Sequence, residues 1–141
     1  MSDQTDSTLA GLQRPLCYVM GLFYTVAGVM HFVVPDAYEQ VVPPPLPAPG
    51  ALVSLSGIAE IVLGIGMLFE RTRELSAWGI IGLLIAVFPS NVYMATADVE
   101  LQGVPEWASD PSETAMWARL PLQGVLIIWE WWYTKPMADE Q

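Results

Sequence analysis

Few polar residues of this chain lie inside stretches that otherwise lack charge, and these are the residues that could carry chemistry. Glu60 is the clearest case, because it is the one charged residue between positions 50 and 69. A charge at the centre of a membrane span costs about 3 kcal/mol on insertion scales, so such groups usually face protein. If this segment spans a membrane, Glu60 therefore points towards another helix, as a packing contact or as part of a binding site.

Depth along the expected helices groups the other polar residues. With a rise of about 1.5 Å per residue, four of them fall in the third of the spans that is farthest from the expected cytoplasmic side: His31, Asn91, Arg119 and Gln123. Glu60 lies near the middle. Apolar walls with a few fixed polar groups are the usual form of a small-molecule site. We therefore expect a pocket in the outer half of the bundle, lined by His31, Glu60, Asn91, Arg119 and Gln123.

Each of these residues also has a purely structural interpretation. Glu60 suits a neutral carboxyl group hydrogen-bonded to a neighbouring helix, and His31 suits an interfacial ring bonded to a loop carbonyl. Asn91 can satisfy backbone groups freed by Pro89, whereas Arg119 can pair with Glu60 or extend towards an acidic loop. Secondary candidates for the pocket are Ser90, Tyr93 and Glu130.

The chain offers few ligands for a redox centre. Cys17 is its single cysteine, so no disulfide or CxxC pair forms within the chain. His31 is its single histidine, which excludes a bis-histidine haem in one chain. We expect no metal site and no resident cofactor, with a quinone or a lipid as the molecule that the pocket would take. Whether the chain is an enzyme stays open, and a non-catalytic role is favoured.

The hydropathy of the chain indicates a membrane protein. Of 141 residues, 53% are hydrophobic and 14% are charged, and the apolar residues gather in four blocks. Blocks of about 20 residues match a hydrocarbon core of about 30 Å, and none shows the polar face that a soluble bundle needs. We predict an all-α, multi-pass membrane protein whose four-helix transmembrane domain covers residues 15–134, with spans at about 15–34, 50–69, 75–97 and 111–134.

The basic residues predict the orientation. Four of the five, Arg14, Arg71, Arg73 and Lys135, fall on one side of the expected spans. Basic residues in short loops stay in the cytoplasm, so we expect a cell-membrane protein whose tails, 1–14 and 135–141, are both cytoplasmic. The net charge of −10 comes from tails and loops. It indicates a cation-binding surface or, as the favoured interpretation, the acidic coat of a protein that lives in high salt.

Proline and small residues predict the local structure of the connections and helices. The segment "PDAYEQVVPPPLPAPG" holds six of the twelve prolines, which predicts a stiff, extended cap rather than a helix. In "SDPSETAMW", Asp110 is the expected N-cap of the last helix. Small-residue stripes on the first three helices predict close helix approach in the inner half. Kinks are expected at Pro89 and Pro121, and an aromatic belt at Trp129, Trp131, Trp132 and Tyr133.

Four stretches together resemble the DoxX-like family of four-helix membrane proteins: "AGVMHFVVPDAYEQVVPPPLP", "SGIAEIVLGIGMLF", "GLLIAVFPSNVYMA" and "RLPLQGVLIIW". The resemblance covers about residues 15–134 and implies a four-helix bundle. Known relatives include a membrane subunit of a thiosulfate:quinone oxidoreductase, subunits needed to mature other redox enzymes, and a chaperone of receptor assembly. Carried over residue by residue, the resemblance singles out His31, Pro35, Gly57, Glu60, Pro89, Asn91, Arg119 and Gln123.

Two classes of function follow from these features. The first is a non-catalytic membrane module that binds a small hydrophobic ligand or assists the assembly of a partner. The second is a membrane subunit of a quinone-linked oxidoreductase, whose redox centre would lie in a partner. The expected partners are the lipid bilayer and a membrane protein or a second copy of the chain, and no nucleic acid is expected.

Overall fold

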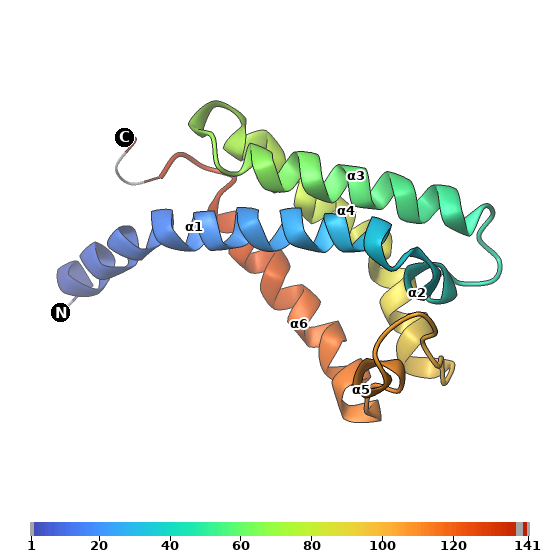
Figure 1. Ribbon diagram of the computed structural model, residues 1–141. Coiled ribbons are helices and arrows are strands. Elements are labelled where there is room, and N and C mark those ends of the chain that lie inside the picture. Colours follow the sequence, from blue (N-terminus) through green and yellow to red (C-terminus); the bar gives the residue numbers. More distant parts are fainter. Residues whose placement is uncertain (1, 138–139, 141) are drawn as a thin grey trace.

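The computed structural model describes residues 2–137 and 140, and the secondary structure of this part of the chain is helical, without strands. The prediction of an all-α fold is confirmed. The long helices are α1 (Ser2–Val33), α3 (Pro49–Gly66), α4 (Glu70–Thr96) and α6 (Glu113–Trp132), shown in Figure 1. Two short helices, α2 (Pro35–Gln40) and α5 (Glu106–Ser109), lie in the connections.

Three of the helices, α1, α3 and α4, are long and apolar enough to cross a membrane. Helix α6 has 20 residues, but its sequence includes three charged residues, Glu113, Arg119 and Glu130. Large apolar side chains also cover the outside of the three apolar helices: Leu22, Val62 and Leu75 are each more than 60% exposed. An apolar surface of this extent fits contact with lipid, and the three helices thus indicate a membrane-embedded protein.

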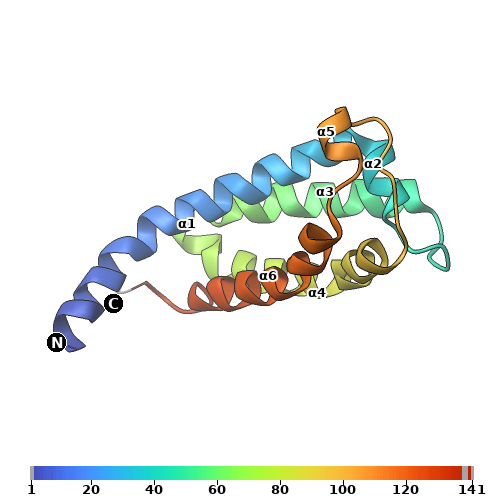
Figure 2. The same cartoon turned by 90° about the horizontal axis from the view of Figure 1, so that it is seen from below.

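The long helices form two pairs. Helix α1 packs along α3, helix α4 packs along α6, and the short turn between α3 and α4 joins the pairs. Figure 1 shows α6 diverging from α1, and Figure 2 shows the α1–α3 pair on one side of the molecule and the α4–α6 pair on the other. The pairing decides which side chains face the space in between.

Glycines allow α1 and α3 to approach closely. A Cβ atom on Gly28 would lie 2.6 Å from the carbonyl oxygen of Gly57, and one on Gly64 would lie 2.8 Å from that of Gly21. Any larger residue at these positions would therefore push the two backbones apart. The expected close approach is present, but it extends along both halves of this pair rather than the inner half alone. On α4, by contrast, Gly82 faces open space.

A buried cluster joins the two pairs at the end of the molecule that holds both termini. It consists of Cys17, Met20, Tyr24, Met67, Ala77, Ile80, Leu84, Tyr133 and Met137. The Tyr133 hydroxyl donates to the carbonyl oxygen of Gln13 at 2.9 Å. The interpretation of Tyr133 as part of an interfacial belt was therefore wrong: its side chain is fully buried, because its hydroxyl has a partner inside the bundle.

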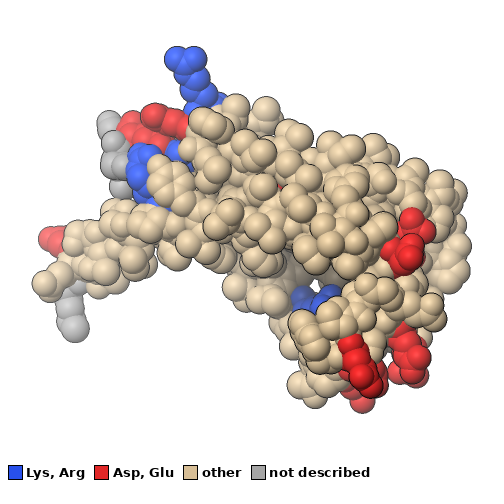
Figure 3. Space-filling view, in the orientation of Figure 1, with Lys and Arg blue, Asp and Glu red and all other residues tan. Residues whose placement is uncertain are grey.

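Most of the basic residues lie at one end of the molecule, while acidic residues lie at both ends (Figure 3). Near the termini, Glu140 forms ion pairs with Arg73 and with Arg14, the latter at 3.4 Å. Figure 3 shows most of the basic atoms at this end, whereas acidic atoms lie both at this end and at the end that carries α2 and α5. The sequence predicted that most of the basic residues share one end.

Two local predictions were wrong. The proline-rich segment is not extended throughout, because its first six residues form α2; proline at a first helical position loses no hydrogen bond, since that N–H would be free anyway. The N-cap of α6 is Ser112 rather than Asp110, and its Oγ accepts from the N–H of Ala115 at 3.2 Å. Helices α4 and α6 continue through Pro89 and Pro121.

Candidate functional site: a pocket between the helix pairs

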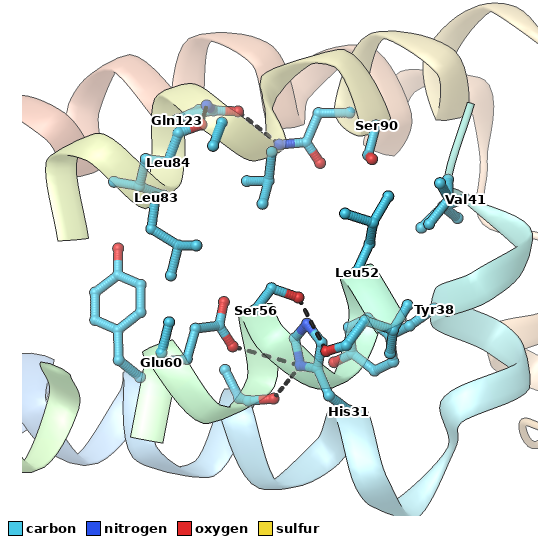
Figure 4. A pocket seen from close by; sticks show the side chains of 18 of the residues that line it. His31, Tyr38, Val41, Leu52, Ser56, Glu60, Leu83, Leu84, Ser90 and Gln123 are labelled. Atoms are coloured by element: carbon cyan, nitrogen blue, oxygen red, sulfur yellow. Dashed lines mark hydrogen bonds and ion pairs between the residues drawn. The ribbon is translucent and has the colours of Figure 1, made fainter. Parts of the chain in front are cut away.

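A pocket of about 770 Å³ lies between the two helix pairs. Its walls come from α1 and α3 on one side and from α4 and α6 on the other. Tyr38 of α2 and the following Val41, Val42 and Leu46 line it as well. The lower part of Figure 4 shows Glu60, Ser56, His31 and Tyr38 on one wall, and the upper part shows Gln123, Leu84 and Ser90 on the other.

The structure brings all five expected pocket residues into this one lining: His31, Glu60, Asn91, Arg119 and Gln123. Of the three secondary candidates, Ser90 lines the pocket, whereas Tyr93 and Glu130 do not. Glu130 lies deeper and is fully buried. The pocket thus carries polar groups on both of its facing walls, while most of its other lining residues are apolar.

His31 is held by three contacts on the first wall. Its Nδ1 lies 2.9 Å from the carbonyl oxygen of Ala27, to which it donates. Its ring stacks on Tyr38 with 3.9 Å between the ring centroids. The backbone of α3 also packs against it, since a Cβ atom added to Gly57 would lie 2.8 Å from the His31 Cβ. A neutral ring that donates through Nδ1 keeps Nε2 as an acceptor for a ligand.

Glu60 lies next to His31, and its side chain is 15% exposed. Its Oε2 is 3.4 Å from the His31 Nδ1, yet this oxygen has no hydrogen-bond partner, because Nδ1 is directed at the carbonyl of Ala27. The contact is therefore an electrostatic one without hydrogen-bond geometry. Oε2 itself is buried beside His31, and it is the exposed remainder of the Glu60 side chain that lines the pocket.

Two amides form the polar part of the second wall. Asn91 Nδ2 donates to Gln123 Oε1 at 2.5 Å, and Gln123 Nε2 donates to the carbonyl oxygen of Leu84. The carbonyl that Pro89 leaves without an N–H partner is that of Ile85, four residues earlier, so the Gln123 bond goes to the carbonyl next to it. The amides thus tie α6 to α4 and face the pocket, whereas the expected bond from Asn91 to a freed backbone group stays a prediction.

Arg119 lies in the more exposed part of the lining. Its Nη1 contacts the sulfur of Met94 at 3.4 Å, and the ion pairs of the described residues include none between Arg119 and Glu60. Burial raises the pKa of Tyr38; Glu60 acts in the same direction, and Arg119 acts against it. The Tyr38 hydroxyl therefore stays protonated at neutral pH, as a potential donor beside the guanidinium group.

Sequence reasoning missed Tyr24 and Ser56 as lining residues. Tyr24 precedes His31 by two helical turns, so both share one face of α1, and this spacing could have revealed it. Ser56 lies one turn before Glu60 on α3. Its hydroxyl donates to the carbonyl oxygen of Val53 at 3.0 Å.

Comparison with protein families gives one match. The family described as a domain of unknown function, DUF8561, matches residues 20–134. The chain belongs to the DUF8561 family. Comparison with curated proteins and with solved structures found no match.

The DUF8561 region contains every residue that lines the pocket. The described residues contain no group of three or more His, Cys, Asp or Glu side chains that could hold a metal ion. What this DUF8561 domain presents inside its bundle is therefore a cavity with apolar walls and two facing sets of hydrogen-bonding groups.

Proposed function

We propose that this DUF8561 protein is a four-helix integral membrane protein that binds a small lipid-like or quinone-like molecule in the pocket. Its role is then non-catalytic: it carries or senses this molecule, or assists the assembly of a membrane partner or of a second copy. The observation that supports this proposal is the pocket of about 770 Å³ with polar groups on two facing walls. Its size lies within the range of about 300–1,000 Å³ that is usual for small-molecule sites.

The lining favours an amphipathic ligand. On one wall, the polar head of the ligand would meet Nε2 of His31 and the carboxyl group of Glu60. On the other wall it would meet the amides of Asn91 and Gln123. The apolar remainder of such a molecule would contact side chains such as Leu84. Burial of the apolar part drives binding, while the polar groups fix the orientation of the head.

The proposed topology has four spans, with α6 as the fourth. Helix α6 packs along α4, so its charged residues Arg119 and Glu130 meet protein rather than only lipid. The basic end of the molecule, with Arg73 and Arg14, would lie in the cytoplasm according to the positive-inside rule. Both termini would then be cytoplasmic in the cell membrane, and the pocket would lie towards the outside.

Single-cysteine labelling tests this topology. In a Cys17→Ser background, we expect an impermeant maleimide added to intact cells to label Pro45→Cys and Glu100→Cys, both in exposed connections, and to leave Glu74→Cys unlabelled. Serine keeps a donor at position 17, where the Cys17 thiol donates to the carbonyl oxygen of Met67. Lysed cells provide the control for reactivity. If only Glu74→Cys were labelled in intact cells, the orientation in the membrane would be the opposite of the one proposed.

Mass spectrometry of the purified protein tests the ligand. We expect a co-purified lipid or quinone in the parent protein and its loss in Ala59→Trp, because position 59 lines the pocket and an indole there fills part of it. The matched control is Ile58→Trp, one residue away on the exposed face of α3, which should retain the molecule. Equal ligand content in both variants would contradict binding in the pocket.

A quinone-linked oxidoreductase subunit is the second candidate. The specific observation in its favour is that donors line both walls, the Tyr38 hydroxyl on one and the amide N–H groups of Asn91 and Gln123 on the other, which suits the two accepting carbonyl groups on opposite sides of a quinone ring. The DoxX-like resemblance supports the same class. In this case the redox centre would belong to a partner protein, and the co-purified molecule would be a quinone rather than a lipid.

A further inference from the structure

Four buried side-chain atoms in the described part of the chain have no hydrogen-bond partner: the Tyr24 hydroxyl, Glu60 Oε2, and both Glu130 carboxyl oxygens. Buried polar groups are almost always hydrogen-bonded, and an unpaired one calls for an explanation. Glu130 is fully buried, and Tyr24 is 3% exposed. Neither residue is therefore solvated from the surface.

These atoms belong to neighbouring groups. Tyr24 interacts electrostatically with both Glu130 and Glu60. Glu60 and Tyr24 line the pocket, whereas Glu130 lies outside the pocket and is buried. Tyr24 thus connects a carboxyl group in the pocket with a carboxyl group inside the bundle.

The series continues towards the end of the molecule that holds the termini. Glu130 interacts with Cys17 and with Tyr133, and Arg73 also interacts with these two residues. Arg73 forms an ion pair with Glu140. Polar or titratable groups therefore follow one another from the pocket to the terminal end.

We propose that Glu60, Tyr24 and Glu130 form a hydrated path that carries protons between the pocket and the terminal end of the bundle. The inference rests on the proposed membrane-spanning arrangement, since only then do the two ends face different compartments. Carboxyl groups in the interior of membrane proteins commonly mark proton relays. The unpaired oxygens are the atoms at which a transferred proton or a bridging water would be held.

The transfer needs no oxidant or reductant. A proton bound to Glu60 passes through water to the oxygen of Tyr24, because these atoms have no direct hydrogen bond, while the Tyr24 hydroxyl gives its own proton through water to the Glu130 carboxylate. Glu130 then releases a proton through water towards the terminal end, and Glu60 takes up another from the pocket. At each step one O–H bond breaks and another forms. The groups that face the path are His31 and Tyr38 beside Glu60, and Cys17, Tyr133 and Arg73 on the far side.

Proton flux into proteoliposomes tests the path. Purified protein is reconstituted with a trapped pH-sensitive dye, and a potassium gradient with valinomycin drives protons inwards. We expect the parent to acidify the vesicles faster than protein-free vesicles. Glu130→Gln and Tyr24→Phe should reduce the flux to the protein-free rate, because an amide cannot release a proton in this way and a phenyl ring cannot hold one. Glu113→Gln, in the exposed first turn of α6, is the matched control.

The outcomes are distinct. A parent protein that conducts no faster than protein-free vesicles would overturn the inference, as would full flux in a folded Glu130→Gln or Tyr24→Phe variant. Thermal unfolding identifies a variant that does not fold, and Tyr24→Phe, which removes a single hydroxyl, covers a failure of Glu130→Gln. Ligand content is measured in the same preparations. A parent protein that conducts protons but contains no ligand would contradict the proposed ligand binding and leave the proton path standing.

Discussion

Replacing Gly28 or Gly57 by alanine is expected to destabilise the protein by about 1–3 kcal/mol, the usual cost of overpacking. A Cβ atom added at Gly28 would lie 2.6 Å from the carbonyl oxygen of Gly57 and 2.8 Å from the backbone nitrogen of Ile61. Since both of these atoms belong to the backbone of α3, no side-chain rotation relieves the clash. The two helices must separate, and His31, which packs against Gly57, would move with them.

Two glycines elsewhere in the bundle provide a control, because alanine at these positions should change the stability in the opposite direction. Gly82 on α4 and Gly124 on α6 have nothing within 4 Å of an added Cβ. Alanine is better than glycine inside a helix by about 0.5–1 kcal/mol, so Gly82→Ala and Gly124→Ala should stabilise the protein slightly. Unfolding in detergent, followed by circular dichroism, measures all four variants. Equal stability of the two sets would show that α1 and α3 are not in close contact.

Gln123→Leu is expected to cost about 1–3 kcal/mol and to weaken binding in the pocket. The side chain of Gln123 is 3% exposed, and it accepts from Asn91 and donates to the carbonyl oxygen of Leu84. Leucine would leave both of these groups without their partner, and a buried polar group left unpaired costs its desolvation energy. Denaturation of the purified protein and its ligand content by mass spectrometry are the two measurements.

A double-mutant cycle separates the shared hydrogen bond from the other effects. Asn91→Leu combined with Gln123→Leu should destabilise less than the sum of the single substitutions, because residues in one hydrogen-bond network are coupled. Val125→Ala, two residues from Gln123, 58% exposed and outside the pocket lining, controls for general disturbance of α6. Strictly additive effects would mean that the two amides act independently.

The sequence predicted the long helices and the depth of the pocket residues because both depend on local patterns. Hydropathy over about 20 residues sets a span, and helical rise converts residue number into depth. Asn91 and Gln123 were therefore expected in the outer third of the spans and Glu60 near the middle, close enough for one pocket to include all three. The glycine stripe around Gly57 also predicted which face of α3 meets another helix.

The features that were missed depend on which helices become neighbours. The pairing of α1 with α3 brings Tyr24 to Glu60, and no periodicity within one helix reveals that pairing. The role of Tyr133 in the core depends on a carbonyl more than a hundred residues away. The N-cap of α6 was predicted wrongly for a local reason. Both Asp110 and Ser112 are residue types that suit an N-cap, and the hydrogen bond from the N–H of Ala115 shows that Ser112 is the cap.

The arrangement of the helix pairs also has a mechanical consequence. The pairs are joined at one end by the buried cluster around Cys17 and Tyr133, and beyond the pocket their connections are joined by two exposed hydrogen bonds between Gln40 and Gln102. The buried cluster is the firmer of the two joints, so a small change in the angle between the pairs becomes a larger change in the width of the pocket. Lateral pressure from the surrounding leaflet would act to bring the pairs together, and an entering molecule must work against it. Tighter packing of the lipid would thus lower the occupancy of the pocket without any change in its contacts.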